Sequence, residues 1–491
     1  MNTKNINSPC LSDLYQFTMG QAIFDADMQD RDSVFHLFYR KNPFGGGYGI
    51  AAGIDPAIEM LANLKFTQDE LHTLAKIRID GEKALHSGYL DFLEQWSFKG
   101  TVHAVDEGEM VFANEPLMRV SGRYHDTELI ETMSLFKVNF QTLVATKSSR
   151  CVRSAQGRSI LEFGLRRAQN AMDASRAAFI GGAHATSNVL AHHEYGIPVK
   201  GTHAHLWVMG MVAEVDDPTL TNEVELMAFR KYAASHPYNC VLLVDTFDTI
   251  RGTKNAIIVG NELRQKGYSL KGIRLDSGDL CSLSIACRKL LDDAGFQNTK
   301  IIASNDLDEN SIASLIHQGS NIDIFGVGTN LVTCADQPAL GGVYKMGAIK
   351  NRHGEWVSTI KKSENIVKTS IPGFLQVRRY SHGGRMDCDV IYDENKGIGE
   401  ITKMIDPLDH SKRRSPAEDT QGRDLLKLRI ENGRLRAPVD SHNLMDARIR
   451  CEQAMKMIDP AVLRFDNPQV YPVGIEERLA EERFKMMCSA A

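Results

Sequence analysis

The pattern that decides the fold stands in three consecutive segments, CVLLVDTFDT (240–249), NAIIVGNELRQKG (255–267) and GIRLDSGDL (272–280). The first and third are short apolar runs that end in polar or glycine residues, and the second has apolar residues at helical spacing. A strand, a helix and a second strand in this order are typical of a parallel sheet with helical connections.

The same arrangement recurs between residues 158 and 345, where we predict seven strands. Besides the two above, strands begin the segments SILEFGLRR (159–167), AAFIGGAHA (177–185), GIPVKGTHAH (196–205), KIIASNDLDE (300–309) and NIDIFGVGTN (321–330). No Gly-x-Gly-x-x-Gly motif follows the first strand, which disfavours a dinucleotide-binding Rossmann domain. We therefore predict a closed or nearly closed β/α barrel, with its chemistry at the carboxyl ends of the strands.

The sequence on either side of the barrel mixes helices and strands. Before the barrel, the patterns predict a helix at 11–26, a strand at 33–40, short strands at 100–122 and one long amphipathic helix at 126–155. After it, they predict strands at 341–350, 373–381 and 388–394 and a helical end at 447–458 and 473–487. We predict an N-terminal α+β domain (1–140), a catalytic barrel domain (141–345) and a C-terminal domain (346–491) that packs on the first.

Composition limits the class of protein. The 491 residues are 43% hydrophobic and 24% charged, with a net charge of −5, which fits a multidomain globular protein without a nucleic-acid-binding face. No apolar run reaches the roughly 18 residues that span a membrane, and the N-terminus lacks the pattern of a signal peptide. The nine cysteines are scattered and form no Cys-x-x-Cys pair, as expected for reduced thiols in the cytoplasm.

Charged residues follow several of the predicted strands. Arg274, Asp276 and Asp279 surround the Ser-Gly turn of RLDSGDL, while Asp245 and Asp306 follow the apolar runs of VDTFDT and SNDLDE. An arginine can bind a carboxylate or phosphate through two N–H groups, and the aspartates can hold Mg²⁺ or face a developing positive charge. The alternative is structural, because an aspartate at this position often caps the helix that follows.

A glycine-rich turn follows the last predicted strand. In FGVGTNLV (325–332), Gly326, Gly328 and Thr329 separate a strand from a helix, so free backbone N–H groups can bind a phosphate there. A plain tight turn gives the same pattern, and the sequence leaves both readings open.

Two aromatic residues and an arginine pair are also candidates. Phe163 precedes Arg166 and Arg167 at the end of the first predicted strand. The ring could cover a flat ligand or belong to the core, and the arginines could bind an anion or lie on the surface. Tyr15, in SDLYQ, is unremarkable by itself.

Two histidines, His203 and His205, stand in GTHAHLWVMG (201–210) at the end of a predicted strand. They could be ligands of a divalent metal, although such a site needs further histidines at strand ends. One of them could be a nucleophile or general base. Both could instead be buried residues that only form hydrogen bonds. A strand-end set of cations, carboxylates, a phosphate-type turn and aromatic rings would suit a phosphorylated and diphosphorylated sugar together with a flat ring.

The motifs FGLRRAQ, KGTHAH, VDTFDT, GIRLDSGDL, SNDLDE and GVGTNLVTC occur in the order found in nicotinate phosphoribosyltransferases, which this chain resembles over most of its length. The resemblance implies an α/β fold with an irregular β/α barrel of the type II phosphoribosyltransferase kind. It also implies a homodimeric cytoplasmic enzyme of NAD biosynthesis that uses Mg²⁺ and ATP. The implied reaction joins nicotinate to phosphoribosyl pyrophosphate, gives nicotinate mononucleotide and pyrophosphate, and is driven by ATP through a phosphorylated histidine.

The resemblance also implies a role for each candidate residue. The phosphorylated histidine of the family's Gly-Thr-x-Ala-His motif falls on His205, with His203 at the variable position. Tyr15 resembles a tyrosine that stacks on the pyridine ring from the partner subunit, and Phe163 would cover the other face. The remaining roles fall on Thr202 and Arg274 (nicotinate, with Arg274 at its carboxylate), Gly326, Gly328 and Thr329 (the sugar 5-phosphate), Arg166 (phosphate or pyrophosphate), and Asp245 and Asp276 (ribose hydroxyls or magnesium pyrophosphate).

One position bears on the choice between nicotinate and its amide. The similar nicotinamide phosphoribosyltransferases carry an aspartate directly after the matching Gly-Thr, whereas this chain has His203. An aspartate would repel the carboxylate of nicotinate, so its absence favours the acid. Leu206 and Lys362 depart from the family pattern at positions to which we assign no chemistry.

Two other classes of function remain as alternatives. A metal-dependent barrel hydrolase would use His203 and His205 as ligands, and a non-enzymatic sensor would bind NAD precursors without converting them. The complete set of reacting groups argues against the sensor.

Overall fold

The computed structural model describes residues 8–217, 219–362, 368–399, 403–439 and 443–488. The chain forms two compact units. Lys147–Pro338 make up the barrel unit, and Met1–Thr146 together with Ala339–Ala491 make up the flanking unit. The boundaries at 140 and 345 stay a prediction, and the long helix α6 (Glu131–Ser154) extends across the first of them.

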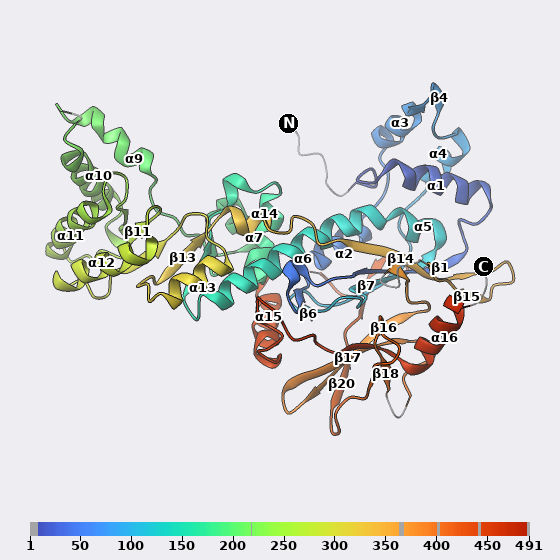
Figure 1. Cartoon of the computed structure of the whole chain (residues 1–491). Coiled ribbons are helices and arrows are strands. Elements are labelled where there is room, and N and C mark those ends of the chain that lie inside the picture. The colour runs from blue at the N-terminus through green and yellow to red at the C-terminus, as the bar shows by residue number, and fades with distance from the viewer. Residues whose placement is uncertain (1–7, 218, 363–367, 400–402, 440–442, 489–491) are drawn as a thin grey trace. The chain divides into compact units, whose positions relative to one another are not determined.

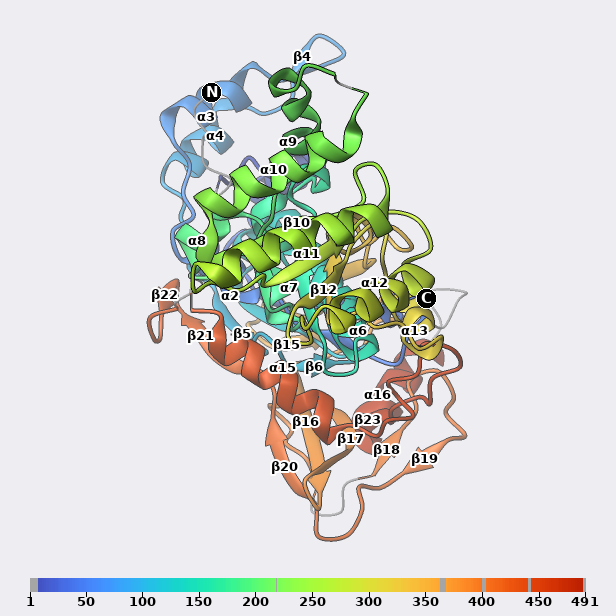
Figure 2. The same ribbon diagram turned by 90° about the vertical axis from the view of Figure 1, so that its left-hand side faces the viewer.

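The barrel unit is built on one parallel sheet of six strands in the order β10-β11-β12-β13-β8-β9 (Figures 1 and 2). The strands are β8 (Ser159–Glu162), β9 (Ala185–Thr186), β10 (Val241–Leu243), β11 (Gly272–Leu275), β12 (Lys300–Ala303) and β13 (Ile324–Val327). Helices α11 (Thr249–Gln265), α12 (Leu280–Asp293) and α13 (Glu309–His317) connect successive strands from β10 to β13. The β/α barrel is therefore confirmed, in an irregular form.

Two of the seven predicted strands are wrong. AAFI (177–180) ends helix α7 (Ala171–Ile180), whose first turn is capped by the side chain of Asn170, and only the two residues of β9 pair afterwards. GIPVK, which follows helix α8 (Val189–Tyr195), contributes a single bridge from Val199 to Thr186. A short apolar run fits a buried helix as well as a strand, so periodicity alone could not separate the two.

The flanking unit combines strands from both ends of the chain. Its larger sheet has the order β15-β14-β1-β7-β5-β21-β22. The strands are β1 (Asp32–Tyr39), β5 (Thr101–Ala104), β7 (Met118–Arg123), β14 (Gly342–Lys350), β15 (Trp356–Ser358), β21 (Lys427–Glu431) and β22 (Arg434–Leu435). The later segments therefore complete a sheet that the first 123 residues begin.

The second sheet of this unit comes from the later part of the chain, in the order β19-β18-β23-β17-β16-β20. Its strands are β16 (Leu375–His382), β17 (Arg385–Asp393), β18 (Met404–Ile405), β19 (Arg413–Arg414), β20 (Gln421–Asp424) and β23 (Val473–Glu476). The helices of the unit are α1 (Leu14–Asp25), α2 (Ile54–Ala62), α3 (Gln68–Lys76), α4 (Ser87–Glu94), α5 (Tyr124–Leu129), α15 (Met445–Met457) and α16 (Glu477–Cys488).

Two helix predictions need correction here. The helix expected at 126–155 is interrupted at Ile130 and forms α5 and α6. Residues 473–476, read as the start of a helix, form β23.

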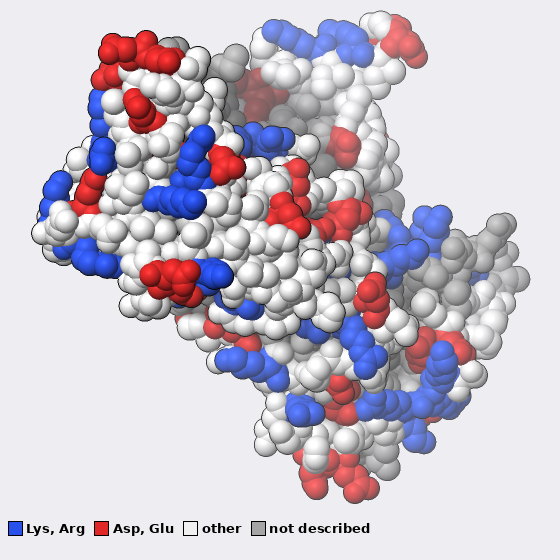
Figure 3. Space-filling view, turned by 60° about the vertical axis from the view of Figure 1, so that its left-hand side comes forward, with Lys and Arg blue, Asp and Glu red and all other residues white. Residues whose placement is uncertain are grey.

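Among the described residues, none of the helices combines the length and apolar character needed to cross a membrane. Acidic and basic side chains are interspersed on the face drawn in Figure 3.

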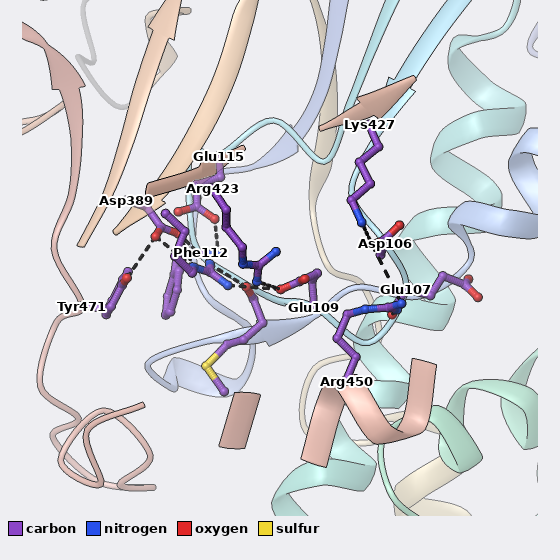
Figure 4. A network of polar contacts seen from close by, with 12 residues as sticks. Asp106, Glu107, Glu109, Phe112, Glu115, Asp389, Arg423, Lys427, Arg450 and Tyr471 are labelled. Atoms are coloured by element: carbon purple, nitrogen blue, oxygen red, sulfur yellow. Dashed lines mark hydrogen bonds and ion pairs between the residues drawn. The ribbon is translucent and has the colours of Figure 1, made fainter. Parts of the chain in front are cut away.

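A buried ion network ties the early and late segments of the flanking unit together (Figure 4). The Arg379 side chain on β16 is fully buried, and it donates hydrogen bonds to both carboxylate oxygens of Asp389 and to the carbonyl oxygen of Met110. Its Nη1 lies 3.3 Å from Glu109, which also accepts a hydrogen bond from Arg423. Arg379 therefore joins residues that are some 270 positions apart in the sequence.

Glu128 on α5 is a second buried charge-bearing group. It is 3% exposed, and neither carboxyl oxygen has a hydrogen-bond partner among the described residues. Burial, with a smaller contribution from the charge of Glu131, raises the pKa of Glu128 to about 9. A neutral carboxyl group is therefore the favoured form in the folded protein at neutral pH.

Replacement of Glu128 by glutamine is expected to flatten the pH dependence of stability. In the unfolded chain the carboxyl loses its proton near pH ~4.3, whereas in the folded protein it keeps it until about pH 9. Between these values the unfolded state binds fewer protons, so the wild type loses up to about 1.4 kcal/mol of stability for each unit that the pH rises. Urea unfolding at pH 5 to 8 should show that the free energy of unfolding of Glu128→Gln rises relative to that of the wild type as the pH increases. If the two free energies change with pH in parallel, Glu128 does not have a raised pKa.

Candidate active site

The aspartates near the carboxyl ends of the barrel strands have two different structural roles. Asp248, Asp279 and Asp308 accept backbone hydrogen bonds at the starts of α11, α12 and α13, so each caps a helix. Asp279 thus takes the structural role that the sequence left open. Asp245, two residues after β10, and Asp276, directly after β11, do not cap these helices and remain available for other contacts.

Arg274 lies at the centre of the strand-end residues. It donates hydrogen bonds to the hydroxyl of Thr202 (3.1 Å), the hydroxyl of Ser304 (2.8 Å) and the carboxylate of Asp276 (3.0 Å). Its guanidinium carbon lies 5.8 Å from the ring centroid of Phe163. These three hydrogen bonds use three of the five N–H groups of the guanidinium, which leaves two for a ligand.

The two aspartates are held by backbone and hydroxyl groups. Asp245 accepts hydrogen bonds from the backbone N–H of Asp276 (2.8 Å) and the hydroxyl of Ser277 (2.6 Å) through one oxygen. Its other oxygen is buried and has no partner among the described residues. Burial acts to raise the pKa of Asp276, but the hydrogen bond from Ser304 and the charge of Arg274 outweigh it and lower that pKa below its ordinary value. Asp276 is therefore a carboxylate at neutral pH.

His205 begins helix α9 (His205–Gly210) with its side chain 38% exposed. Its Nδ1 lies 3.1 Å from the hydroxyl of Thr246, and its Nε2 lies 3.7 Å from Asp276. Thr246 and Asp276 both lie just after barrel strands, β10 and β11. His205 is thus brought to the same place as Arg274 and Asp276, with its Nε2 directed at the carboxylate.

His203 has a different environment. Its ring is buried, and Nε2 accepts a hydrogen bond from the backbone N–H of Leu243 (3.1 Å) while Nδ1 faces the carbonyl oxygen of Ala204 (3.5 Å). Burial lowers the pKa of His203 to about 4. A neutral histidine with both nitrogens occupied fits the structural reading, and no group of three or more metal-binding side chains was found among the described residues.

Phe163 and the glycine-rich turn lie against each other. A side chain at Gly326 would bring its Cβ within 2.6 Å of the Phe163 ring, so this glycine makes room for the ring. Gly328 precedes the short helix α14 (Thr329–Thr333). A Cβ atom at this position would lie 3.4 Å from the carbonyl oxygen of Phe163. Arg166 is exposed in a single turn at 165–167 that follows Phe163. The barrel unit thus gathers ten of the predicted residues near its strand ends.

Tyr15 belongs to the flanking unit, on α1, where half of its side chain is exposed. Burial and the charge of Glu131 raise its pKa. Its part in the site stays a prediction, as does that of every residue role given above.

The chain is similar to known proteins over most of its length. Family models of the nicotinate phosphoribosyltransferase N-terminal domain, family and C-terminal domain match residues 10–139, 153–373 and 376–483. Nicotinate phosphoribosyltransferase of Bacillus subtilis is 40% identical over 474 residues, which cover 95% of this chain and 92% of that protein. The chain belongs to the nicotinate phosphoribosyltransferase family. It is therefore an enzyme.

Further relatives agree with this membership. Nicotinate phosphoribosyltransferase of Dictyostelium discoideum is 38% identical over 524 residues, covering 96% of this chain and 87% of that protein. The crystal structure of human nicotinic acid phosphoribosyltransferase matches with a TM-score of 0.81 and 27% identity, covering 97% of this chain and 99% of that one. The barrel with its flanking sheets is thus the fold of the nicotinate phosphoribosyltransferase family.

Two site residues were not predicted from the sequence. Ser304 donates a hydrogen bond to Asp276 and accepts one from Arg274, and Thr246 contacts His205. Ser304 directly follows β12 and Thr246 stands three residues after β10, and each lies close to an aspartate in SNDLDE or VDTFDT. A hydroxyl residue at the end of a barrel strand in this nicotinate phosphoribosyltransferase fold was the signal that could have found them.

Proposed function

We propose that this enzyme transfers the phosphoribosyl group of phosphoribosyl pyrophosphate to the ring nitrogen of nicotinate, giving nicotinate mononucleotide and pyrophosphate for NAD biosynthesis. The observation that carries the proposal is the position of Arg274, beside the Phe163 ring and the Thr202 hydroxyl, with two N–H groups left over. A planar aromatic acid could stack on Phe163 and place its carboxylate at these N–H groups.

The environment of position 203 supports the acid rather than the amide. The neutral ring of His203 places no negative charge near Thr202, so no carboxylate there would repel nicotinate or accept a hydrogen bond from nicotinamide. The carboxylate of Asp276 forms an ion pair with Arg274 at 3.0 Å.

Transfer at the anomeric carbon develops positive charge on the ribose ring, and a carboxylate beside that carbon stabilises it. We assign this task, and the binding of the ribose hydroxyls, to Asp245 and Asp276. Gly326, Gly328 and Thr329 would bind the 5-phosphate and Arg166 a phosphate of the donor. These carboxylates fit Mg²⁺ carried by the pyrophosphate, since Mg²⁺ usually takes one or two carboxylates together with substrate phosphates; when bound, it would neutralise the leaving group.

ATP would enter the reaction through His205. When Nδ1 carries the proton and donates it to Thr246, Nε2 carries the lone pair and would attack the γ-phosphorus of ATP. The bond from this phosphorus to the β,γ-bridging oxygen would break, and ADP would leave. A phosphoryl group there adds nearly two negative charges next to Asp276, and we propose that the resulting repulsion reorders the strand-end loops around the substrates. We further propose a cytoplasmic homodimer in which Tyr15 of the partner subunit completes the nicotinate site.

Replacement of Arg274 by alanine tests the function and the role together. The wild type should release pyrophosphate when given nicotinate, and far less when given nicotinamide. Arg274→Ala should raise the KM for nicotinate about 10- to 100-fold, because a hydrogen bond to a charged group contributes ~1.5–3 kcal/mol. The KM for phosphoribosyl pyrophosphate should change much less.

Arg274→Lys is the matched control, since lysine keeps the positive charge but cannot form two parallel hydrogen bonds to a carboxylate. Its KM for nicotinate should lie between those of the wild type and Arg274→Ala. Equal changes in both KM values would contradict carboxylate binding by Arg274. Stoichiometric, tightly held Zn²⁺ in the purified protein, with no pyrophosphate release, would favour the barrel hydrolase instead.

A further inference from the structure

A cavity of about 630 Å³ lies inside the barrel unit. This volume falls within the roughly 300–1,000 Å³ that small-molecule sites usually have. Phe163 and Thr202, which belong to the candidate active site, line one part of it. The cavity is therefore continuous with the place where we expect the pyridine ring.

The cavity runs along the strands because the barrel interior is incompletely filled. Ser159, Leu161 and Phe163 alternate along β8 and its end, so their side chains share one face, and all three line the cavity. Four residue steps separate Ser159 from Phe163, which is ~13 Å along a strand. The small side chains of Ser159 and Ala185 occupy positions that closed barrels fill with layers of Val, Ile and Leu.

The far end of the cavity is positively charged. Lys271 directly precedes β11, Lys300 is the first residue of β12, and Arg264 lies near the end of α11, so all three belong to the amino-terminal side of the strands. They line the cavity, and no Asp or Glu does so among the described residues. Arg264 lies against the ring of Phe296 (4.2 Å), and Lys300 pairs with Asp323, which does not line the cavity.

An apolar passage with cations at one end and Arg274 near the other suits one kind of molecule. A small aromatic acid can place its ring against Leu161, Val241 and Ile324, while its carboxylate is attracted at either end. A cleft that has one sign of charge and apolar walls raises the local concentration of the opposite ion and its association rate, by about 10- to 1,000-fold in favourable cases.

We propose that the barrel interior is a binding compartment and entry route for the aromatic carboxylate substrate, entered from the amino-terminal ends of the strands. The proposal rests on the proposed function and adds a path by which nicotinate reaches Phe163 separately from phosphoribosyl pyrophosphate. The larger, more highly charged donor would reach the strand ends from the carboxyl side, where Asp245 and Thr329 lie.

Two substitutions at the amino-terminal end test the route without changing any residue assigned to the active site. Ser159→Phe places a ring in the passage, and Lys271→Glu reverses a charge at its entrance. Lys289→Glu, on the exposed side of α12, is the matched control for the charge change. The readouts are kcat/KM for nicotinate, its dependence on salt concentration, and the KM for phosphoribosyl pyrophosphate.

Lys271→Glu is expected to lose about tenfold in kcat/KM for nicotinate, in line with the lower limit for electrostatic steering, and Ser159→Phe about as much because its ring obstructs the passage. The donor KM should change less than about twofold in both. Lys271→Glu should also weaken the salt dependence, while Lys289→Glu behaves as the wild type. Variants that match the Lys289→Glu control, or that lose equally toward both substrates, would overturn the route. If Ser159→Phe does not fold, Lys271→Glu still tests the route, because Lys271 is exposed and its replacement does not disturb the core. A wild type without nicotinate-dependent pyrophosphate release would instead refute the proposed function.

Discussion

A His205→Asn variant is expected to take up no phosphoryl group from γ-labelled ATP, whereas the wild type becomes labelled. The label should be acid-labile and base-stable, as a phosphorus–nitrogen bond is. The reason lies in the geometry of the imidazole: Thr246 contacts Nδ1, the side chain is 38% exposed, and among the described residues Nε2 has no polar contact closer than the 3.7 Å to Asp276 that would keep a phosphoryl group away. Stimulation of pyrophosphate release by ATP should disappear with the label.

His193→Asn is the matched control for this experiment, because His193 is 78% exposed on α8 in the same unit. It should leave the labelling unchanged. Thr246→Val should slow labelling without abolishing it, since the tautomer of His205 would no longer be fixed by a hydrogen bond. An acid-stable, base-labile label, or a label that survives in His205→Asn, would exclude a phosphohistidine at this position.

The second large effect is expected on stability, from Arg379→Ala. This change removes the cation that Asp389 and Glu109 share. Glu109 keeps its contact with Arg423, whereas Asp389 keeps the hydroxyl of Tyr471 and becomes a buried carboxylate that has lost its Arg379 cation. Breaking a buried ion pair by removal of one partner typically costs about 3–5 kcal/mol. Denaturant unfolding, followed by a signal from the flanking unit, should therefore show a strongly lowered midpoint.

Arg423→Ala provides the control, because it removes another cation from the same Glu109 at a side chain that is 49% exposed. Only the arginine end of this pair is exposed, and the buried Glu109 keeps Arg379 in this variant, so Arg423→Ala should lose much less stability than Arg379→Ala. Equal losses in the two variants would show that burial of Arg379 is not what makes its contacts strong.

The barrel could be predicted because its signals are local. Each of β8, β10, β11, β12 and β13 is an apolar run that ends in polar residues, and a strand of this kind is readable from a few positions. AAFI failed because the same apolar letters follow a helix cap at Asn170 and complete its helix. The flanking sheet was harder, since nothing near Asp32 indicates that its strand will pair with residues around 349.

The site shows the same limit. The positions of Arg274, Asp276 and Asp245 followed from the rule that barrel chemistry collects at strand ends. Which aspartates cap helices could not be read, because VDTFD, DSGD and NDLD each offer two carboxylates only two or three positions apart. The distinction between His203 and His205 likewise depends on the backbone of Leu243, which lies 40 positions away.

The interleaved sheet of the flanking unit has a consequence for how the polypeptide is made. The pairing of β5 with β21 joins Ala104 to Lys427, so the amino-terminal strands emerge from the ribosome long before their neighbours exist. Residues 147–338 are complete earlier and can collapse around their own sheet while synthesis continues. Nascent chains that stop before about residue 430 would therefore carry an open β5 edge, a surface on which chaperones or other unfinished copies can add a strand.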